Sequence, residues 1–115
     1  MRPIRISYDP EGDTLYLTFG QPTSATGYQL SDQVLVRIDP RTQEAAGLTI
    51  FNFSVHAGAG QDILFPRLEE DVEVKARLMP ILVSPPIANF LRITEDQQGV
   101  RAVLLSPSLR EAVAV

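Results

Sequence analysis

The chain has no cysteine, no tryptophan and a single histidine, His56, among its 115 residues. Without cysteine there is no disulfide, thiolate nucleophile, iron–sulfur cluster or cysteine-based zinc site. One histidine also excludes metal sites that need a histidine pair. We therefore expect no metal and no other cofactor. The lack of cysteine is compatible with the cytoplasm, which is the compartment we expect.

Positive charge is scarce as well. Ten lysines and arginines stand against fourteen acids, for a net charge of −4, and the basic residues are scattered singly. Binding to nucleic acid usually needs a basic stripe, so we expect no nucleic-acid partner. No apolar run approaches the roughly 18 residues of a membrane-spanning helix, and the first residues do not resemble a signal peptide. We expect no membrane association.

A β-hairpin signal lies near the start of the chain. Residues 4–8 and 14–19 both alternate apolar and polar side chains, which is typical of strands with one buried face. Between them, Asp9 can accept hydrogen bonds from the turn backbone and Pro10 presets its own φ. We expect Gly12 to adopt a positive φ and to close a type I turn with a G1 bulge, so that Gly12→Ala would strain the backbone.

Three more strands complete an expected β-meander of about five strands. Alternation predicts them at residues 26–30, 34–38 and 46–53, and Asp39-Pro40 repeats the turn chemistry of the first hairpin. The last of these strands is apolar on both faces, with Phe51 and Phe53 opposite Leu48 and Ile50. A strand of that kind is usually covered on both sides, so we expect the second half of the chain to pack over the sheet near it.

The second half predicts a mixed region. Residues 56–61 are glycine-rich and suggest a hinge. Pro66 followed by acids favours a helix over residues 66–79, limited by Pro80, although residues 72–77 also alternate like a strand. Three further elements are expected: a short helix capped by Ser84 at residues 84–91, a hairpin of residues 91–94 and 100–105 about a turn at 96–99, and a last helix at 106–112. The expected fold class is α+β, a single domain over residues 1–115 in which residues 56–115 cover the meander of residues 1–55.

Three segments carry a family resemblance. They are Ile6 to Leu17 (ISYDPEGDTLYL), Val34 to Asp39 (VLVRID) and Gly47 to Ser54 (GLTIFNFS). In order and spacing they resemble a family of small prokaryotic proteins, domain of unknown function 2283. The resemblance covers about residues 2–55 and implies a compact β-rich domain without an assigned chemistry. It also implies a possible place in toxin–antitoxin-type pairs, because some members look like partners in such pairs.

Several polar residues are candidates for a site. Asp9, Glu11 and Asp13 alternate around a turn, but the calcium loop of an EF-hand needs Gly and Glu where this chain has Thr14 and Gly20. Turn stabilisation explains these acids. His56 could be combined with Ser54 and Asp62 into a triad, but no nucleophile-elbow motif accompanies them. We therefore predict no catalytic residue and interpret His56 as a loop residue.

The densest acidic cluster consists of Glu69, Glu70, Asp71 and Glu73. The favoured interpretation is a solvated helix N-terminus, and the alternative is a docking surface for a basic protein.

Without a coherent catalytic set, the expected function is non-enzymatic association, either with a second copy as a homodimer or with a protein partner. A dimer seam could use the apolar residues of the second half, namely Ile81, Leu82, Val83, Leu104, Leu105, Val113 and Val115. The alternatives are an antitoxin-like partner of a basic toxin, and a small-ligand protein or enzyme that uses acids with His56.

Overall fold

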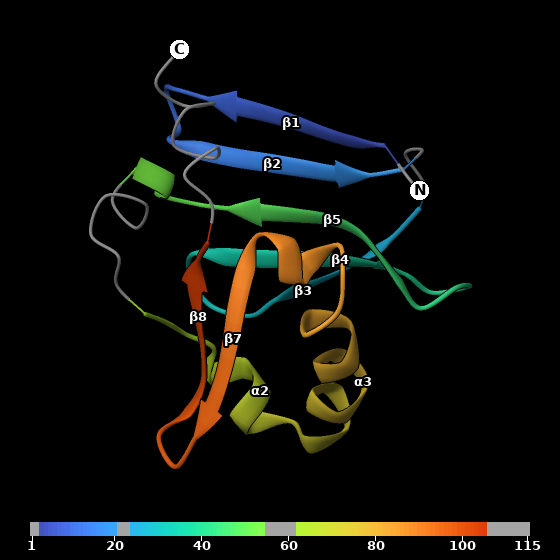
Figure 1. The fold of residues 1–115 in the computed structure, drawn as a ribbon, viewed down its shortest axis with the longest axis vertical. Helices are drawn as coiled ribbons and strands as arrows, with labels where there is room; N and C mark the ends of the chain where they lie inside the picture. Colours follow the sequence, from blue (N-terminus) through green and yellow to red (C-terminus); the bar gives the residue numbers. More distant parts are fainter. Residues whose placement is uncertain (1–2, 21–23, 55–61, 106–115) are drawn as a thin grey trace.

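A five-stranded antiparallel sheet forms the first half of the protein in this computed structural model, which describes residues 3–20, 24–54 and 62–105. Its strand order is β1-β2-β5-β4-β3, so the first and third strands of the chain are its two edges (Figure 1). The strands are β1 (Ile4–Asp9), β2 (Thr14–Phe19), β3 (Thr26–Gln29), β4 (Val34–Asp39) and β5 (Glu44–Ile50). The expected antiparallel sheet of five strands is confirmed, but its meander order was wrong: in a meander β2 would pair with β3, and here β2 pairs with β5, which lies in the middle of the sheet.

The second half supplies a smaller sheet and short helices. A three-stranded sheet has the order β6-β8-β7, from β6 (Ile63–Leu64), β7 (Leu91–Asp96) and β8 (Gly99–Leu104). Between β6 and β7 the chain forms α2 (Pro66–Glu70), α3 (Val72–Leu82) and the 3-10 helix η1 (Ile87–Asn89). In the part of the chain that is described, no helix combines the length and the apolar character needed to cross a bilayer.

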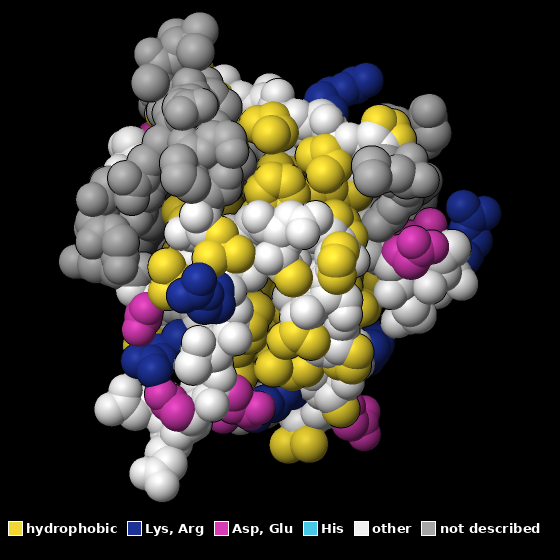
Figure 2. Space-filling view, viewed as in Figure 1, with side chains coloured by type: hydrophobic (Ala, Val, Ile, Leu, Met, Phe, Trp, Pro, Cys, Tyr) yellow, Lys and Arg dark blue, Asp and Glu magenta, His cyan; other side chains and the backbone are white. Residues whose placement is uncertain are grey.

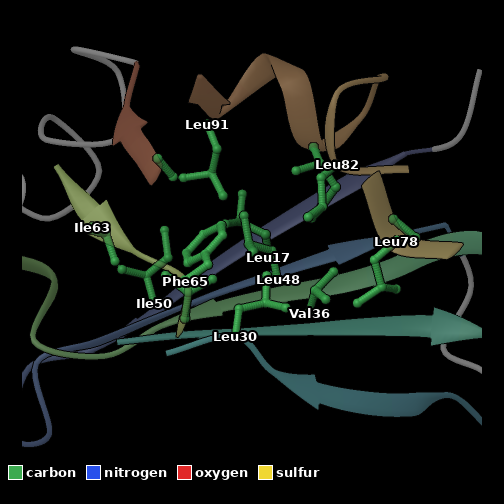
Figure 3. Close-up of a cluster of buried hydrophobic side chains, with 14 of the residues drawn as sticks. Leu17, Leu30, Val36, Leu48, Ile50, Ile63, Phe65, Leu78, Leu82 and Leu91 are labelled. Carbon is green, nitrogen blue, oxygen red and sulfur yellow. The ribbon is translucent and has the colours of Figure 1, made fainter. Parts of the chain in front are cut away.

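Both halves contribute to one hydrophobic core. Leu17, Val36 and Leu48 project from one face of the large sheet, and their register places them in one row across β2, β5 and β4. Opposite them lie side chains of the second half, among them Phe65, Leu78, Leu82 and Leu91, all at most 1% exposed (Figure 3). The expectation that the second half packs over the sheet is confirmed for its described residues.

The other face of the large sheet carries small and polar residues. Thr18, Gly47 and Arg37 form one row across it, and Tyr16, Thr49 and Leu35 form the next. Tyr16 is 43% exposed. The alternation along the strands therefore separates a covered face from a more polar one, as expected for an antiparallel sheet.

The first hairpin corrects the prediction for Gly12. Asp9 pairs with Thr14 in unbroken register, and the residue with positive φ in the loop is Asp13, at 49°. Gly12 has no positive φ, so the expected G1 bulge and the strain on Gly12→Ala were wrong. In a four-residue loop the last position takes the left-handed conformation, and aspartate tolerates it better than most residues.

β5, the last strand of the large sheet, ends earlier than expected. β5 ends at Ile50, and Phe51 and Asn52 form a turn in which Asn52 has a φ of 53°. The expected strand over residues 46–53 therefore ran too far at its end, although Leu48, Thr49 and Ile50 are buried on both faces of β5. Phe53 is buried because the chain turns back toward the core, where its ring meets the edge of Tyr8 at a centroid distance of 6.3 Å.

The helical region confirms one expectation and corrects two. Residues 66–79 are helical rather than extended, but as two helices, and Pro80 lies inside α3 instead of limiting it. The alternation of Val72 and Val74 is misleading, because only Val74 faces the core, at spacing i, i+4 from Leu78.

The expected helix at residues 84–91 shrinks to η1, and Ser84 does not cap it. The Ser84 hydroxyl instead donates to the Pro80 carbonyl at 2.7 Å, beside the end of α3. The hairpin β7–β8 about Gln97 and Gln98 is confirmed. The hinge at residues 56–61 and the helix at 106–112 lie outside the described residues.

Candidate functional site

Asp13 connects the first hairpin to the end of β5. Its carboxylate accepts the Tyr8 hydroxyl at 2.6 Å, the Ser54 hydroxyl at 2.7 Å and the Ser54 backbone N–H at 3.1 Å. The Asp13 carbonyl also accepts the Phe53 N–H at 2.9 Å. We call Tyr8, Asp13 and Ser54 the latch. It joins positions 41 residues apart in sequence, so its role is to hold tertiary structure.

The chemistry of the latch is that of a stable hydrogen-bonded carboxylate. The hydrogen bond to Asp13 is the main reason that the pKa of Tyr8 is raised above 10.0, with burial and the charges of Asp13 and Asp9 adding to it. A phenol with a raised pKa keeps its proton at neutral pH and serves as a donor. The Ser54 hydroxyl also donates a hydrogen bond to Asp13. In a catalytic triad the serine hydroxyl would instead donate to a histidine base.

The suggested triad gains no geometric support from the described residues. His56 lies outside them. Asp62 accepts a hydrogen bond from Arg101 Nη1 at 3.1 Å, and the other guanidinium nitrogen, Nη2, bonds to Asp96. Asp62 thus takes part in an ion-paired cluster on the small sheet, and Ser54 in the latch.

Asp9 and Gly12 act within the turn itself. Asp9 Oδ1 accepts the Glu11 backbone N–H at 3.1 Å, as expected for a residue that begins a turn. A Cβ added to Gly12 would lie 2.9 Å from Asp9 Oδ2. Glycine therefore makes room for the Asp9 side chain at this position.

Two of the four acids in the predicted cluster have structural partners. Asp71 ends α2 and caps α3, since its side chain accepts the backbone N–H groups of Glu73 and Val74. Glu69 lies 3.6 Å from Lys75, which also pairs with Glu95. The hydrogen bond to Glu95 is the main cause of the raised pKa of Lys75, and the charges of Glu69 and Glu95 contribute; partial burial opposes it.

Glu70 and Glu73 remain exposed acids of this cluster. Glu70 borders an open groove of about 500 Å³ between the β3–β4 turn and the β6–α2 segment, together with Asp32 and Arg67. Across residues 3–20, 24–54 and 62–105, no three histidine, cysteine, aspartate or glutamate side chains gather as a metal site would require.

The expected dimer seam is divided by the fold. Leu82 is fully buried in the core, and Ile81, Leu104 and Leu105 are half-buried. Val83 is 53% exposed, while Val113 and Val115 lie outside the described residues. These residues cannot all belong to one dimer seam, as predicted, because Leu82 faces the core.

An exposed apolar strand edge is the feature that the sequence did not reveal. β1 is a terminal strand of the large sheet, and its Ile4 and Ile6 are 42% and 43% exposed although their cross-strand partners Phe19 and Leu17 are buried. Hydrophobic side chains appear in the part of Figure 2 where β1 and β2 lie in Figure 1. We call the open side of Ile4–Asp9 the β1 edge.

The fold and these side chains define an α+β protein whose polar clusters, in the described residues, stabilise turns, helix ends and contacts between strands. Residues 5–54 match the family model for a protein of unknown function, DUF2283. The resemblance deduced from the sequence is confirmed over this part of the chain. Searches of curated proteins and of solved structures each found no significant match.

Proposed function

We propose that this protein is a non-enzymatic association module and that the β1 edge is its docking element. The observation that carries the proposal is the exposure of Ile4 and Ile6 on a strand that, among the described residues, pairs with another strand on one side alone. An open edge offers unpaired backbone N–H and C=O groups to another chain, and natural sheets usually protect such edges with charge, proline or a covering element. Apolar side chains on β1 favour its use in binding.

The polar clusters favour association over catalysis. Asp13 is surrounded by donors of the latch, and Asp71 caps α3. A candidate catalytic group would need a base, a nucleophile and an orienting group in mutual reach. The absence of cysteine and the acidic composition are compatible with a role in the cytoplasm.

A test compares the two edges of the same sheet. Ile6→Lys places a charge on β1, and Thr26→Lys is the matched control on β3, where Thr26 is exposed and pairs with the core residue Ile38. Both variants should keep the unfolding temperature of the parent within a few degrees. Complexes would be measured by light scattering on purified protein and by chemical crosslinking in native cells.

We expect Ile6→Lys to lose the complexes and Thr26→Lys to keep them. Equal complexes in both variants, or no complex by either method, would contradict the proposal. A basic protein captured through β1 would identify the antitoxin-like form of the function, with a heterologous partner at this edge.

A further inference from the structure

The occupant of the β1 edge can be inferred from the chemistry of the strand itself. We propose that it is a second copy of this chain, paired antiparallel through β1 with Ser7 at the twofold axis. This inference rests on the association function proposed above and specifies its partner. It follows from three observations: the direction of the backbone groups, the side chains on the apolar face, and the charges on the polar face.

The backbone groups limit the possible registers. Gly20 donates its N–H to the Pro3 carbonyl, which makes residues 3 and 20 a hydrogen-bonded pair between β1 and β2. Bonding alternates along an antiparallel pair, so Arg5, Ser7 and Asp9 also bond toward β2. Ile4, Ile6 and Tyr8 therefore direct their N–H and C=O groups to the open side, and only these residues can form the hydrogen-bonded pairs of a new ladder.

Charge selects one register among those that remain. Arg5 and Asp9 are exposed on the same face of β1, and the described residues include no ion-pair partner for Arg5. With Ser7 at the axis, Arg5 lies opposite Asp9 of the second copy, and this pair occurs twice by symmetry. A register centred on Arg5 would bring two guanidinium groups together. A register centred on Ile6 would leave Arg5 opposite Ser7.

The apolar face agrees with the same register. Ile6 lies opposite Tyr8 of the second copy, on the side of the sheet that continues into the core. Pairing of a β-branched residue with an aromatic one is favourable across strands. The two five-stranded sheets would join into one sheet of ten strands, and both open β1 edges would be closed.

The cysteine-free sequence allows a direct test with Ser7→Cys. In the proposed register the two residues at position 7 form a non-hydrogen-bonded pair with Cα atoms about 4.5 Å apart, within the range for a disulfide. In the register centred on Ile6 they would be separated by about 8 Å, too far for a bridge. Gly27→Cys is the matched control, since Gly27 lies on the same face of β3 at the opposite edge.

We expect purified Ser7→Cys to form a disulfide-linked dimer at least tenfold faster than Gly27→Cys. We also expect Arg5→Glu, in the parent background, to raise the dimer dissociation constant about tenfold, because two attractive pairs become repulsive. Light scattering across a concentration series would measure the dissociation constant.

Three results would overturn the inference. Purified protein that stays monomeric at all concentrations excludes a second copy; if complexes from cells still depend on Ile6, the association function stands with another partner. Efficient crosslinking of Ile6→Cys but not Ser7→Cys contradicts the register. Equal crosslinking of Ser7→Cys and Gly27→Cys indicates random collision.

Discussion

The two Asp-Pro hairpins of the large sheet share a local design and differ in what they contact. Each has a four-residue loop in which the leading aspartate accepts the backbone N–H two residues on, from Glu11 in the first hairpin and Arg41 in the second. In each loop the fourth residue has positive φ, Asp13 at 49° and Gln43 at 60°. The same local sequence pattern therefore accompanies the same turn geometry in both hairpins.

The difference lies in the fourth residue of each loop. Asp13 accepts hydrogen bonds from Tyr8 and from Ser54, which lies 41 residues later, just after the central strand β5. Gln43 donates only to the Pro40 carbonyl of its own loop among the side-chain bonds of the described residues, at 3.0 Å. The same turn geometry thus supports a long-range hydrogen-bonded contact in the first hairpin, whereas in the second it only reverses the direction of the chain.

The largest expected effect comes from breaking this asymmetry with Asp13→Ala. The substitution removes a carboxylate that accepts hydrogen bonds from the Tyr8 hydroxyl and from the hydroxyl and backbone N–H of Ser54, so we expect it to lower the free energy of unfolding by about 2 kcal/mol. Gln43→Ala is the matched control, because it changes the same loop position without a long-range partner, and it should cost about 0.5 kcal/mol or less. Urea denaturation of both variants measures the difference. Equal costs would contradict the anchoring role of Asp13.

A smaller effect is expected from Tyr8→Phe, which keeps the aromatic contact with Phe53 and removes the hydrogen bond to Asp13. The pKa of Tyr8 is raised in the folded state. Its contribution to stability is therefore complete below the unfolded pKa of about 10 and is lost as pH rises through the folded pKa.

The chain has three tyrosines, Tyr8, Tyr16 and Tyr28, so absorbance of phenolate as a function of pH can follow this titration. We expect Tyr8→Phe to remove the titration at the highest pH and to flatten the loss of stability above pH about 10. If the absorbance lost in the variant came from the lower part of the titration curve, Tyr8 would not be the residue with the raised pKa.

The smallest expected effect is that of Gly12→Ala. Position 12 has no positive φ, and the equivalent position of the second hairpin is Thr42. The new methyl group must displace only the end of the Asp9 side chain, so we expect a cost of about 0.5 kcal/mol, below that of a strained backbone. Thermal unfolding measures this cost. A value above about 1 kcal/mol would show that position 12 of the first hairpin requires glycine.

Sequence patterns predicted the elements whose causes are local. The β1–β2 and β7–β8 hairpins follow from alternation and turn residues, and α2 begins at Pro66 as a helix with acids in its first turn should. Errors arose where a tertiary contact decides the outcome. Phe53 continues the apolar pattern of β5, but the chain turns at Asn52 and buries Phe53 against Tyr8.

The candidate site was predictable only in part for the same reason. Asp13 and Asp71 could be selected as acids near a turn and a helix start, but their hydrogen-bond partners depend on the folded chain. The β1 edge could not be predicted, since alternation shows which side of a strand is buried and not which strands border the sheet. That information lies in the strand order, where β2 pairs with β5 rather than β3.

The latch also has a mechanical consequence. Ser54 is the last residue of the segment that matches the family model, and the described chain resumes at Asp62 with the part that packs on the sheet. A pulling force applied to the second half would reach the large sheet through Ser54. At that residue the Asp13 carboxylate of the first hairpin accepts both the hydroxyl and the backbone N–H of Ser54. The latch would then carry part of that load before it reaches β5.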